Sequence, residues 1–289
     1  MNSSVSVVMA TLGEQDLSLV INSLLSNSVA PFEILICIPN EYYYRVERYE
    51  TTNIRVVKTD KCGQVYQRCI GFSAAKGHYI MQIDDDVILD RFCIESLISG
   101  IRLMGDKTAA SPTLYYKNTD YSVYKLNSSI IKKMYYWIIN GRNGYSQGSV
   151  TKAGVCFGVD PSISSGDYVL SEWLPGGCVM HTKDNLILKN FFPFPGKAFS
   201  EDLIHSWLLR KKGIELFVCR KGLGYINIEG SSHTENFCVF MRLVFLDFRA
   251  RKYYVKISRR SKLRMYIYYM IQIILYFFLR IMSSFSNNK

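Results

Sequence analysis

Strand-like and helix-like segments alternate over the first 83 residues, and this alternation restricts the fold more than any other feature. Four short apolar runs have the length of buried strands: residues 4–10, 31–40, 53–58 and 79–83. Between them, apolar residues recur at helical spacing in segments 17–25 and 64–77. Such alternation favours parallel strands joined by right-handed crossovers. The predicted fold is therefore an α/β sheet with helices on both faces.

The rest of the chain is less regular. Residues 105–170 are rich in Tyr, Asn, Ser and Gly, and we expect a loop-bearing region that shapes a pocket. Strand-like sequence returns at 168–184, which contains a Gly-Gly break. A helix is predicted from Ser200, as its cap, to Gly213, because two acids begin it and basic residues end it.

Composition places the chain among globular proteins, with 48% hydrophobic and 20% charged residues. The net charge is +11, and nine cations against one anion lie between Met241 and Arg264. Because the excess is so localised, we predict no nucleic-acid partner. The eight cysteines form no C-x-x-C pair, which favours buried thiols in a reducing compartment, and the N-terminus lacks a secretory signal pattern. A cytoplasmic location is therefore predicted.

The fourth predicted strand runs directly into three carboxylates, Asp84, Asp85 and Asp86. Alternate side chains of an extended chain share a face, so Asp84 and Asp86 can point into one cleft. In α/β sheets, ligands bind at the carboxyl ends of strands. Two hard oxygen ligands suit Mg²⁺ or Mn²⁺, and the ion would offset the repulsion between the carboxylates. The alternative is a turn whose acids cap the next helix.

Two further features have the residue types of an active site. Glu201 and Asp202 begin a predicted helix, where a carboxylate can serve as a general base or simply favour the helix terminus. Gly176 and Gly177 interrupt a strand, which indicates close approach of a ligand, and the indole of Trp173 can stack on a sugar ring. A bulge beside a core tryptophan is the alternative.

Three segments in this order, "GQVYQRCIGFSAAKGHYIMQIDDDV", "EWLPGGCVM" and "SEDLIHSWLLRKKG", resemble the inverting GT-A-fold glycosyltransferases of family 2. The resemblance covers about residues 4–235. It implies a Rossmann-like, mostly parallel sheet, a nucleotide-sugar donor, a hydroxyl acceptor and a divalent cation, Mn²⁺ or Mg²⁺. It also implies a role in bacterial surface-polysaccharide or O-antigen-like synthesis.

The resemblance assigns roles by position. It implies that Asp86 holds the metal, with Asp84 and His233 as further ligands. The side chains that it implies in donor binding are Asp84, Asp85, Gln64, Arg68, Thr11 and Glu41. In the acceptor and sugar pocket it implies Trp173, Gly176 and Gly177. It implies Asp202 as the general base and Glu201 as an acid that orients the acceptor or caps the helix.

One stretch departs from the family pattern. Related enzymes carry an acidic "DDGS"-like stretch after the second strand, where an Asp contacts the nucleobase, whereas this chain has "IPNEYYY". Asn40 or Glu41 can take over that contact. UDP, dTDP and GDP donors all remain open.

The C-terminal segment, residues 236–289, is predicted to dock on the membrane and to follow a catalytic domain at 1–235. Within it, residues 265–282 are almost free of charge, and as a helix they would measure about 27 Å, slightly short of a bilayer core. Four tyrosines and the preceding cations suit the inner face of the plasma membrane. A lipid-linked saccharide acceptor fits this location, and a helix buried on the catalytic domain is the alternative.

Two other functions are compatible with the sequence. A sugar-nucleotide pyrophosphorylase also combines an α/β fold with an Asp-bound metal, although the chain has no Gly-rich N-terminal phosphate loop. A catalytically inactive membrane scaffold could keep the same fold. The presence of both acidic motifs favours an active transferase.

Overall fold

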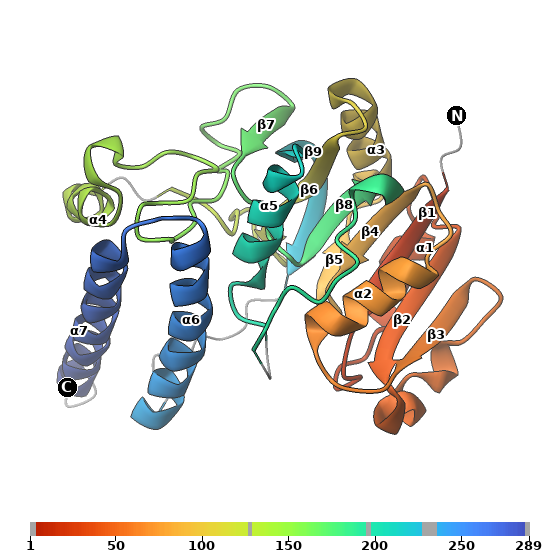
Figure 1. The fold of residues 1–289 in the computed structure, drawn as a ribbon, viewed down its shortest axis with the longest axis horizontal. Coiled ribbons are helices and arrows are strands. Elements are labelled where there is room, and N and C mark those ends of the chain that lie inside the picture. Colours follow the sequence, from red (N-terminus) through yellow and green to blue (C-terminus); the bar gives the residue numbers. More distant parts are fainter. Residues whose placement is uncertain (1–3, 127–128, 195–197, 227–235, 287–289) are drawn as a thin grey trace. The chain divides into compact units, whose positions relative to one another are not determined.

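A nine-stranded sheet forms the centre of the first of two units, unit 1, which comprises Met1–Lys125 and Gly158–Asn227 (Figure 1). The computed structural model describes residues 4–126, 129–194, 198–226 and 236–286, with the backbone alone for 281–286. Within these residues the strand order is β3-β2-β1-β4-β8-β6-β9-β5, and β7 pairs with β9. The strands are β1 Val5–Ala10, β2 Glu33–Pro39, β3 Ile54–Thr59, β4 Tyr79–Ile83, β5 Val87–Leu89, β6 Thr108–Tyr116, β7 Tyr168–Ser171, β8 Cys178–Thr182 and β9 Glu215–Ile226.

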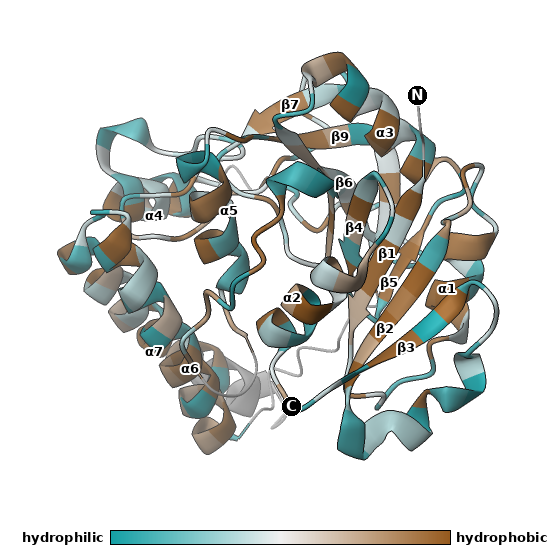
Figure 2. Cartoon of the chain, turned by 45° about the vertical axis from the view of Figure 1, so that its right-hand side comes forward, coloured by the Kyte–Doolittle hydropathy of each residue, from teal (hydrophilic) through white to brown (hydrophobic). Residues whose placement is uncertain are grey.

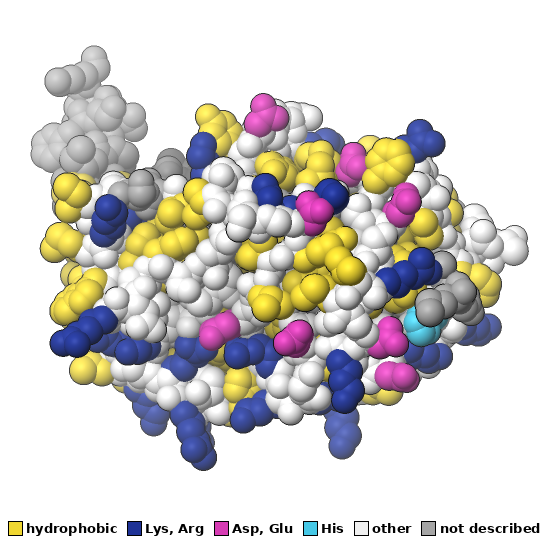
Figure 3. Space-filling model, turned by 90° about the horizontal axis from the view of Figure 1, so that it is seen from above, with side chains coloured by type: hydrophobic (Ala, Val, Ile, Leu, Met, Phe, Trp, Pro, Cys, Tyr) yellow, Lys and Arg dark blue, Asp and Glu magenta, His cyan; other side chains and the backbone are white. Residues whose placement is uncertain are grey.

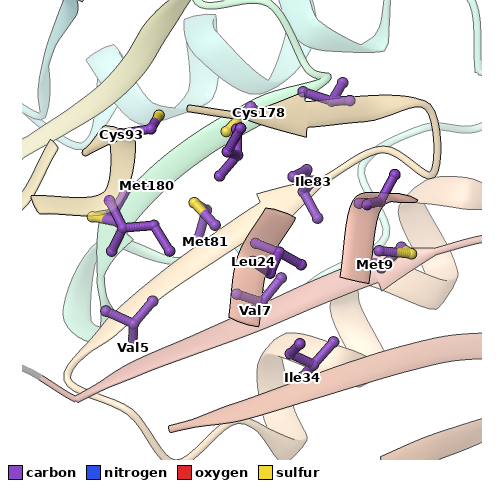
Figure 4. Close-up of a cluster of buried hydrophobic side chains, with 14 of the residues drawn as sticks. Val5, Val7, Met9, Leu24, Ile34, Met81, Ile83, Cys93, Cys178 and Met180 are labelled. Atoms are coloured by element: carbon purple, nitrogen blue, oxygen red, sulfur yellow. The ribbon is translucent and has the colours of Figure 1, made fainter. Parts of the chain in front are cut away.

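Helices cover both faces of this sheet. Those of unit 1 are α1 Ser18–Leu25, α2 Gln64–Ala74, α3 Cys93–Met104 and α5 Glu201–Lys211. Alternate residues of β1 separate the two faces. Val5, Val7 and Met9 belong to a cluster with residues of α1 and α3, whereas Val8 packs with residues of α2. Figure 4 shows part of the first cluster, and Figure 2 shows the hydrophobic strands between the helices.

The α/β prediction is confirmed, and the parallel part of the sheet is its N-terminal half. β1 pairs in parallel with β2 and β4, and β2 with β3, because helical crossovers connect them. The other half is mixed: β6 and β9 are parallel, while β8, β5 and β7 run antiparallel to their neighbours. Five of the eight cysteines are buried, as their position in apolar runs predicts.

The second unit, unit 2, comprises Leu126–Phe157 and Ile228–Lys289. Its helices are α4 Ile130–Asn140, α6 Phe237–Ile257 and α7 Lys262–Ser286. α6 and α7 pack as an antiparallel pair, since Phe237 contacts Phe277 near one end and Phe248 contacts Tyr266 near the other. Residues 126–157, which the sequence predicts only as loop-bearing, thus contain a helix that belongs with the C-terminal pair.

Candidate active site

The three carboxylates lie at the carboxyl end of β4, as predicted, in the turn that leads to β5. The backbone N–H of Asp84 donates to the carbonyl of Gly177 at 2.8 Å, which ties this turn to the start of β8. At the neighbouring end of β1, the Thr11 hydroxyl donates to Asp85 Oδ2 at 2.5 Å. Burial raises the pKa of Asp85, and the hydrogen bond from Thr11 opposes that rise. The structure therefore brings Thr11, Asp84 and Asp85 together.

Arg68 connects the two acidic motifs. It lies on α2 and is only 3% exposed. Its Nη2 donates to Asp84 Oδ1 at 2.5 Å and to the Gly176 carbonyl at 3.2 Å, and its Nη1 donates to Glu201 Oε1. Two residues separated by 117 positions in the sequence, Asp84 and Glu201, thus share one guanidinium. The alternative interpretation of both motifs as separate helix caps does not account for this contact.

Burial and charge oppose each other in this cluster. Burial raises the pKa of Glu201, and the Arg68 guanidinium opposes that rise. Burial lowers the pKa of Arg68, but the carboxylates of Glu201 and Asp84 outweigh it, so that the pKa is raised above its ordinary value. A buried charge without a partner lowers the stability of the fold by on the order of several kcal/mol. The Arg68 guanidinium therefore favours the ionised form of Glu201 against the effect of burial.

The two glycines differ in how closely their neighbours approach. A Cβ on Gly176 would lie 2.6 Å from Glu201 Oε1, whereas a Cβ on Gly177 would lie 3.5 Å from Val87 and 3.6 Å from Asp84 Oδ2. The carbonyl of Gly176 also accepts from Gln82 Nε2 at 2.8 Å. Only the first glycine is thus required by close packing, and what it packs against is the buried carboxylate.

We expect Gly176→Ala to lower the melting temperature and to reduce turnover, because the new methyl group would displace Glu201 from Arg68. Overpacking of this kind destabilises by about 1–3 kcal/mol. Gly177→Ala is the matched control, since its neighbours lie at ordinary contact distance. Thermal melts and rate measurements on both variants test the difference. Equal tolerance of the two substitutions would contradict the packing argument.

A hollow of about 380 Å³ opens beside this cluster. It is lined by Ala10, Thr11, Leu12, Glu14, Gln15, Cys62, Gly63, Gln64, Gln67 and Asp85. Three of the predicted donor-binding residues, Thr11, Gln64 and Asp85, are among them, and Gln64 Nε2 also donates to Asp84 Oδ1 at 3.0 Å. Its volume lies in the range of small-molecule sites.

Gln67 is a lining residue that the sequence analysis missed. Its buried amide donates to the carbonyls of Thr11 and Cys37, each at 2.8 Å, and accepts from the Gly63 N–H at 3.2 Å. It thereby joins the ends of β1 and β2 to the start of α2. Its position in the sequence could have indicated this role, because it lies one helical turn after Gly63 and next to Arg68 in the predicted helix.

Asp202 follows Glu201 in the first turn of α5 and is half-buried. Its Oδ1 accepts from the Leu203 N–H at 2.9 Å. The prediction that Ser200 caps this helix is wrong: Ser200 has left-handed backbone geometry, with φ at 53°, and its side chain makes no capping hydrogen bond. Because Glu201 is directed to Arg68, the two adjacent acids have different surroundings.

The other predicted site residues that the structure describes differ from one another in their surroundings. Trp173 is 3% exposed and packs edge-on against Tyr124, which is the geometry of a core residue, so its stacking role stays a prediction. Glu41 is outside the lining of the hollow, but its carboxylate accepts from Cys62 Sγ at 3.6 Å. Asp86 is half-buried in the turn after β4. His233 falls outside the described residues.

Comparison with solved structures confirms the predicted GT-A fold. A crystal structure of GalNAc-T7 with UDP, GalNAc and Mn²⁺ matches with a TM-score of 0.58 at 14% identity, over 81% of this chain and 45% of that one. Two structures of TarS from S. aureus, each 16% identical over 85% of this chain, superpose less closely, with TM-scores of 0.45 and 0.46. The chain spans 65% and 39% of those two chains.

The family follows from the sequence itself. Residues 6–164, more than half of the chain, match the family model described as glycosyl transferase family 2. The chain belongs to this family. No curated protein sequence matches it.

Proposed function

We propose that the protein transfers a sugar, with inversion, from a nucleoside diphosphate donor to a hydroxyl of a lipid-linked saccharide at the inner face of the plasma membrane. The observation that carries this proposal is the contact of Arg68 with both Asp84 and Glu201. It joins Asp84 at the end of β4 to Glu201 at the start of α5 through one guanidinium. Bacterial polysaccharide or O-antigen-like synthesis is the process that fits such an acceptor.

A divalent cation fits the acids at the end of β4. Among the described residues, no three His, Cys, Asp or Glu side chains are grouped so as to hold an ion. Asp86 and Asp84 would therefore supply part of a coordination shell of hard oxygen ligands, which suits Mg²⁺ or Mn²⁺ completed by donor phosphates and water. When bound, the cation would stabilise the charge of the leaving diphosphate.

The chain's own residues would then divide the work. Asp202 would accept the proton of the acceptor hydroxyl while that oxygen attacks the anomeric carbon and the diphosphate leaves with the bonding electrons. One displacement of this kind inverts the anomeric centre. Glu201 and Arg68, which are buried and paired, would act as positioning residues. Thr11, Gln64 and Asp85 would hold the donor in the hollow that they line.

The membrane location rests on unit 2. One helix in the described residues is long and apolar enough to cross a bilayer, at Lys262–Arg280, and only 11% of that stretch is buried. Membrane association would place the active site near a lipid-linked acceptor.

Thermal-shift binding to UDP, GDP, dTDP and CMP, with and without Mn²⁺, tests this function. We expect one nucleoside diphosphate to raise the melting temperature by about 5 °C at a hundred times its Kd, and only with the cation. Asp86→Ala should abolish the effect, whereas Asp120→Ala, an exposed control, should keep it. If no nucleotide stabilises the wild type, an inactive scaffold becomes the better interpretation.

A further inference from the structure

All of the excess positive charge belongs to unit 2. This unit holds 15 of the 35 Lys and Arg residues but only 3 of the 24 Asp and Glu residues, so its net charge is +12 and that of unit 1 is −1. Such a charge attracts an anionic surface. Anionic lipid headgroups attract basic segments near the membrane surface.

The solvent-exposed side of α7 carries a row of apolar residues. Leu263, Ile267, Met270, Ile274 and Phe278 recur at three or four residues, and all of them are exposed except Ile267, which is half-buried. Cations occur only near the ends of this stretch, at Lys262, Arg264 and Arg280. In a soluble domain, a surface helix directs its apolar side toward the core, whereas α7 exposes these apolar residues to solvent. One-sided exposure is typical of a helix that lies in a membrane interface.

The opposite side of α7 is covered by α6 along most of its length. Phe240 stacks on Tyr276 at 4.0 Å, and Tyr269 donates to Asp247 Oδ2 at 2.6 Å. The buried Arg251 donates to Asp247 Oδ1 at 2.8 Å and to the Tyr269 hydroxyl at 3.1 Å. If α7 crossed the bilayer in this packing, α6 would enter with it. Arg242, Asp247, Arg249 and Arg251 would then lie in hydrocarbon, which is strongly unfavourable.

α4 presents a second apolar row on the exposed side of unit 2. Ile130, Ile131, Met134 and Trp137 are between 59% and 80% exposed, and Lys132 and Lys133 flank them. The other side of the helix packs on Phe157 and Tyr268. Arg264 of α7 donates to the Trp137 carbonyl at 3.1 Å, which ties α4 to the start of α7. Figure 3 shows hydrophobic side chains beside Lys and Arg at its left edge, where α4 lies.

We propose that α7 and α4 lie together in the plane of an anionic membrane surface, and that α7 does not span it. The apolar rows of the two helices enter the headgroup boundary. The exposed cations Arg242, Lys252 and Lys256 of α6, and Arg259 in the turn that follows it, contact lipid phosphates. The occupant is a bilayer because the apolar rows are bordered by cations and no acid lies within them. This proposal rests on the membrane association in the proposed function.

Trp137 reports directly on α4. With vesicles of phosphatidylglycerol and phosphatidylethanolamine, we expect its emission to shift to the blue and to be quenched by lipids brominated near the headgroup. Trp137→Phe should remove this change, because Trp173 is buried and Trp207 belongs to unit 1. Ile131→Glu with Met134→Glu should reduce vesicle binding about tenfold or more, since charge replaces apolar contact. Ile163→Glu, at an exposed apolar position in unit 1, is the control.

Labelling separates an in-plane helix from a span. Arg280→Cys is prepared in a chain whose exposed Cys62 and Cys238 are Ser, and it is treated with a membrane-impermeant maleimide after binding to preformed vesicles. In the plane, residue 280 stays reactive. In a span from Lys262 it lies about 27 Å away, across the bilayer, and is protected. Protection, an unchanged Trp137 spectrum, or dimers without lipid binding would overturn the proposal.

Turnover of a nucleotide sugar is measured in the same samples. Intact turnover without vesicle binding would overturn the membrane proposal alone. Vesicle binding without turnover of any donor would overturn the proposed transferase function alone.

Discussion

Replacing Arg68 by methionine is expected to lower the free energy of unfolding by about 3–5 kcal/mol, because it leaves the buried carboxylate of Glu201 without its charged partner. Arg68 and Glu201 are 3% and 5% exposed, so water can hardly replace the lost contact. Urea unfolding at neutral pH measures the change. Donor turnover should also fall, since Asp84 and Glu201 would lose the group that holds them together.

The loss of stability in this variant should depend on pH. Burial raises the pKa of Glu201, and without Arg68 nothing described here opposes that rise directly. A carboxyl whose pKa is raised by folding stabilises the protein most below its unfolded pKa, near 4.5, and loses that contribution as pH increases. The difference between variant and wild type should therefore shrink as pH falls from 7 toward about 4.5.

Two controls make the Arg68 prediction specific. Arg55→Met removes an exposed arginine that lies 3.6 Å from Glu33, and it should change stability by less than about 1 kcal/mol. Adding Glu201→Gln to Arg68→Met should restore part of the lost stability, because the buried charge is removed with its partner. An Arg68→Met protein as stable as the wild type would show that the cluster does not hold the site together.

Asp202→Asn is expected to reduce kcat by about a hundredfold to ten-thousandfold while nucleotide binding and the melting temperature stay close to wild type. The amide oxygen of asparagine can still accept from the Leu203 N–H, so the helix start should be kept. Asparagine cannot take a proton from the acceptor hydroxyl. Release of nucleoside diphosphate from the donor measures the rate.

Asp167→Asn serves as the matched control for this substitution, since Asp167 pairs with Lys221 on the surface of unit 1. Its turnover should equal that of the wild type. A full rate in Asp202→Asn would exclude this residue as the base and would direct attention to Glu201.

The sequence was most informative where burial is continuous. The four parallel strands were predicted because each is a short apolar run, and the position of Asp84–Asp86 followed from the rule for strand ends. Arg68 could not be placed in the same way. An arginine on a helix is usually solvated, and only the fold shows that it is buried between two acids distant in sequence.

Predictions from residue type and periodicity were less informative where contacts between distant parts of the chain determine the local structure. Ser200 has the residue type of a helix cap, but its left-handed backbone prevents that role. Trp173 has the residue type of a sugar platform, and its burial against Tyr124 could not be predicted from sequence, so its stacking role stays a prediction. α4 was missed because its apolar residues are exposed, whereas pattern rules assume that such residues face a core.

Whether the sugar is transferred with inversion can be determined from the anomeric configuration of the product. Proton NMR follows the wild-type enzyme, Mn²⁺ and the sugar nucleotide whose diphosphate gives the thermal shift. We expect the first product signal to have the anomeric configuration opposite to the donor's, and to form far more slowly with Asp202→Asn. A first product with the donor's configuration would contradict single displacement with Asp202 as base.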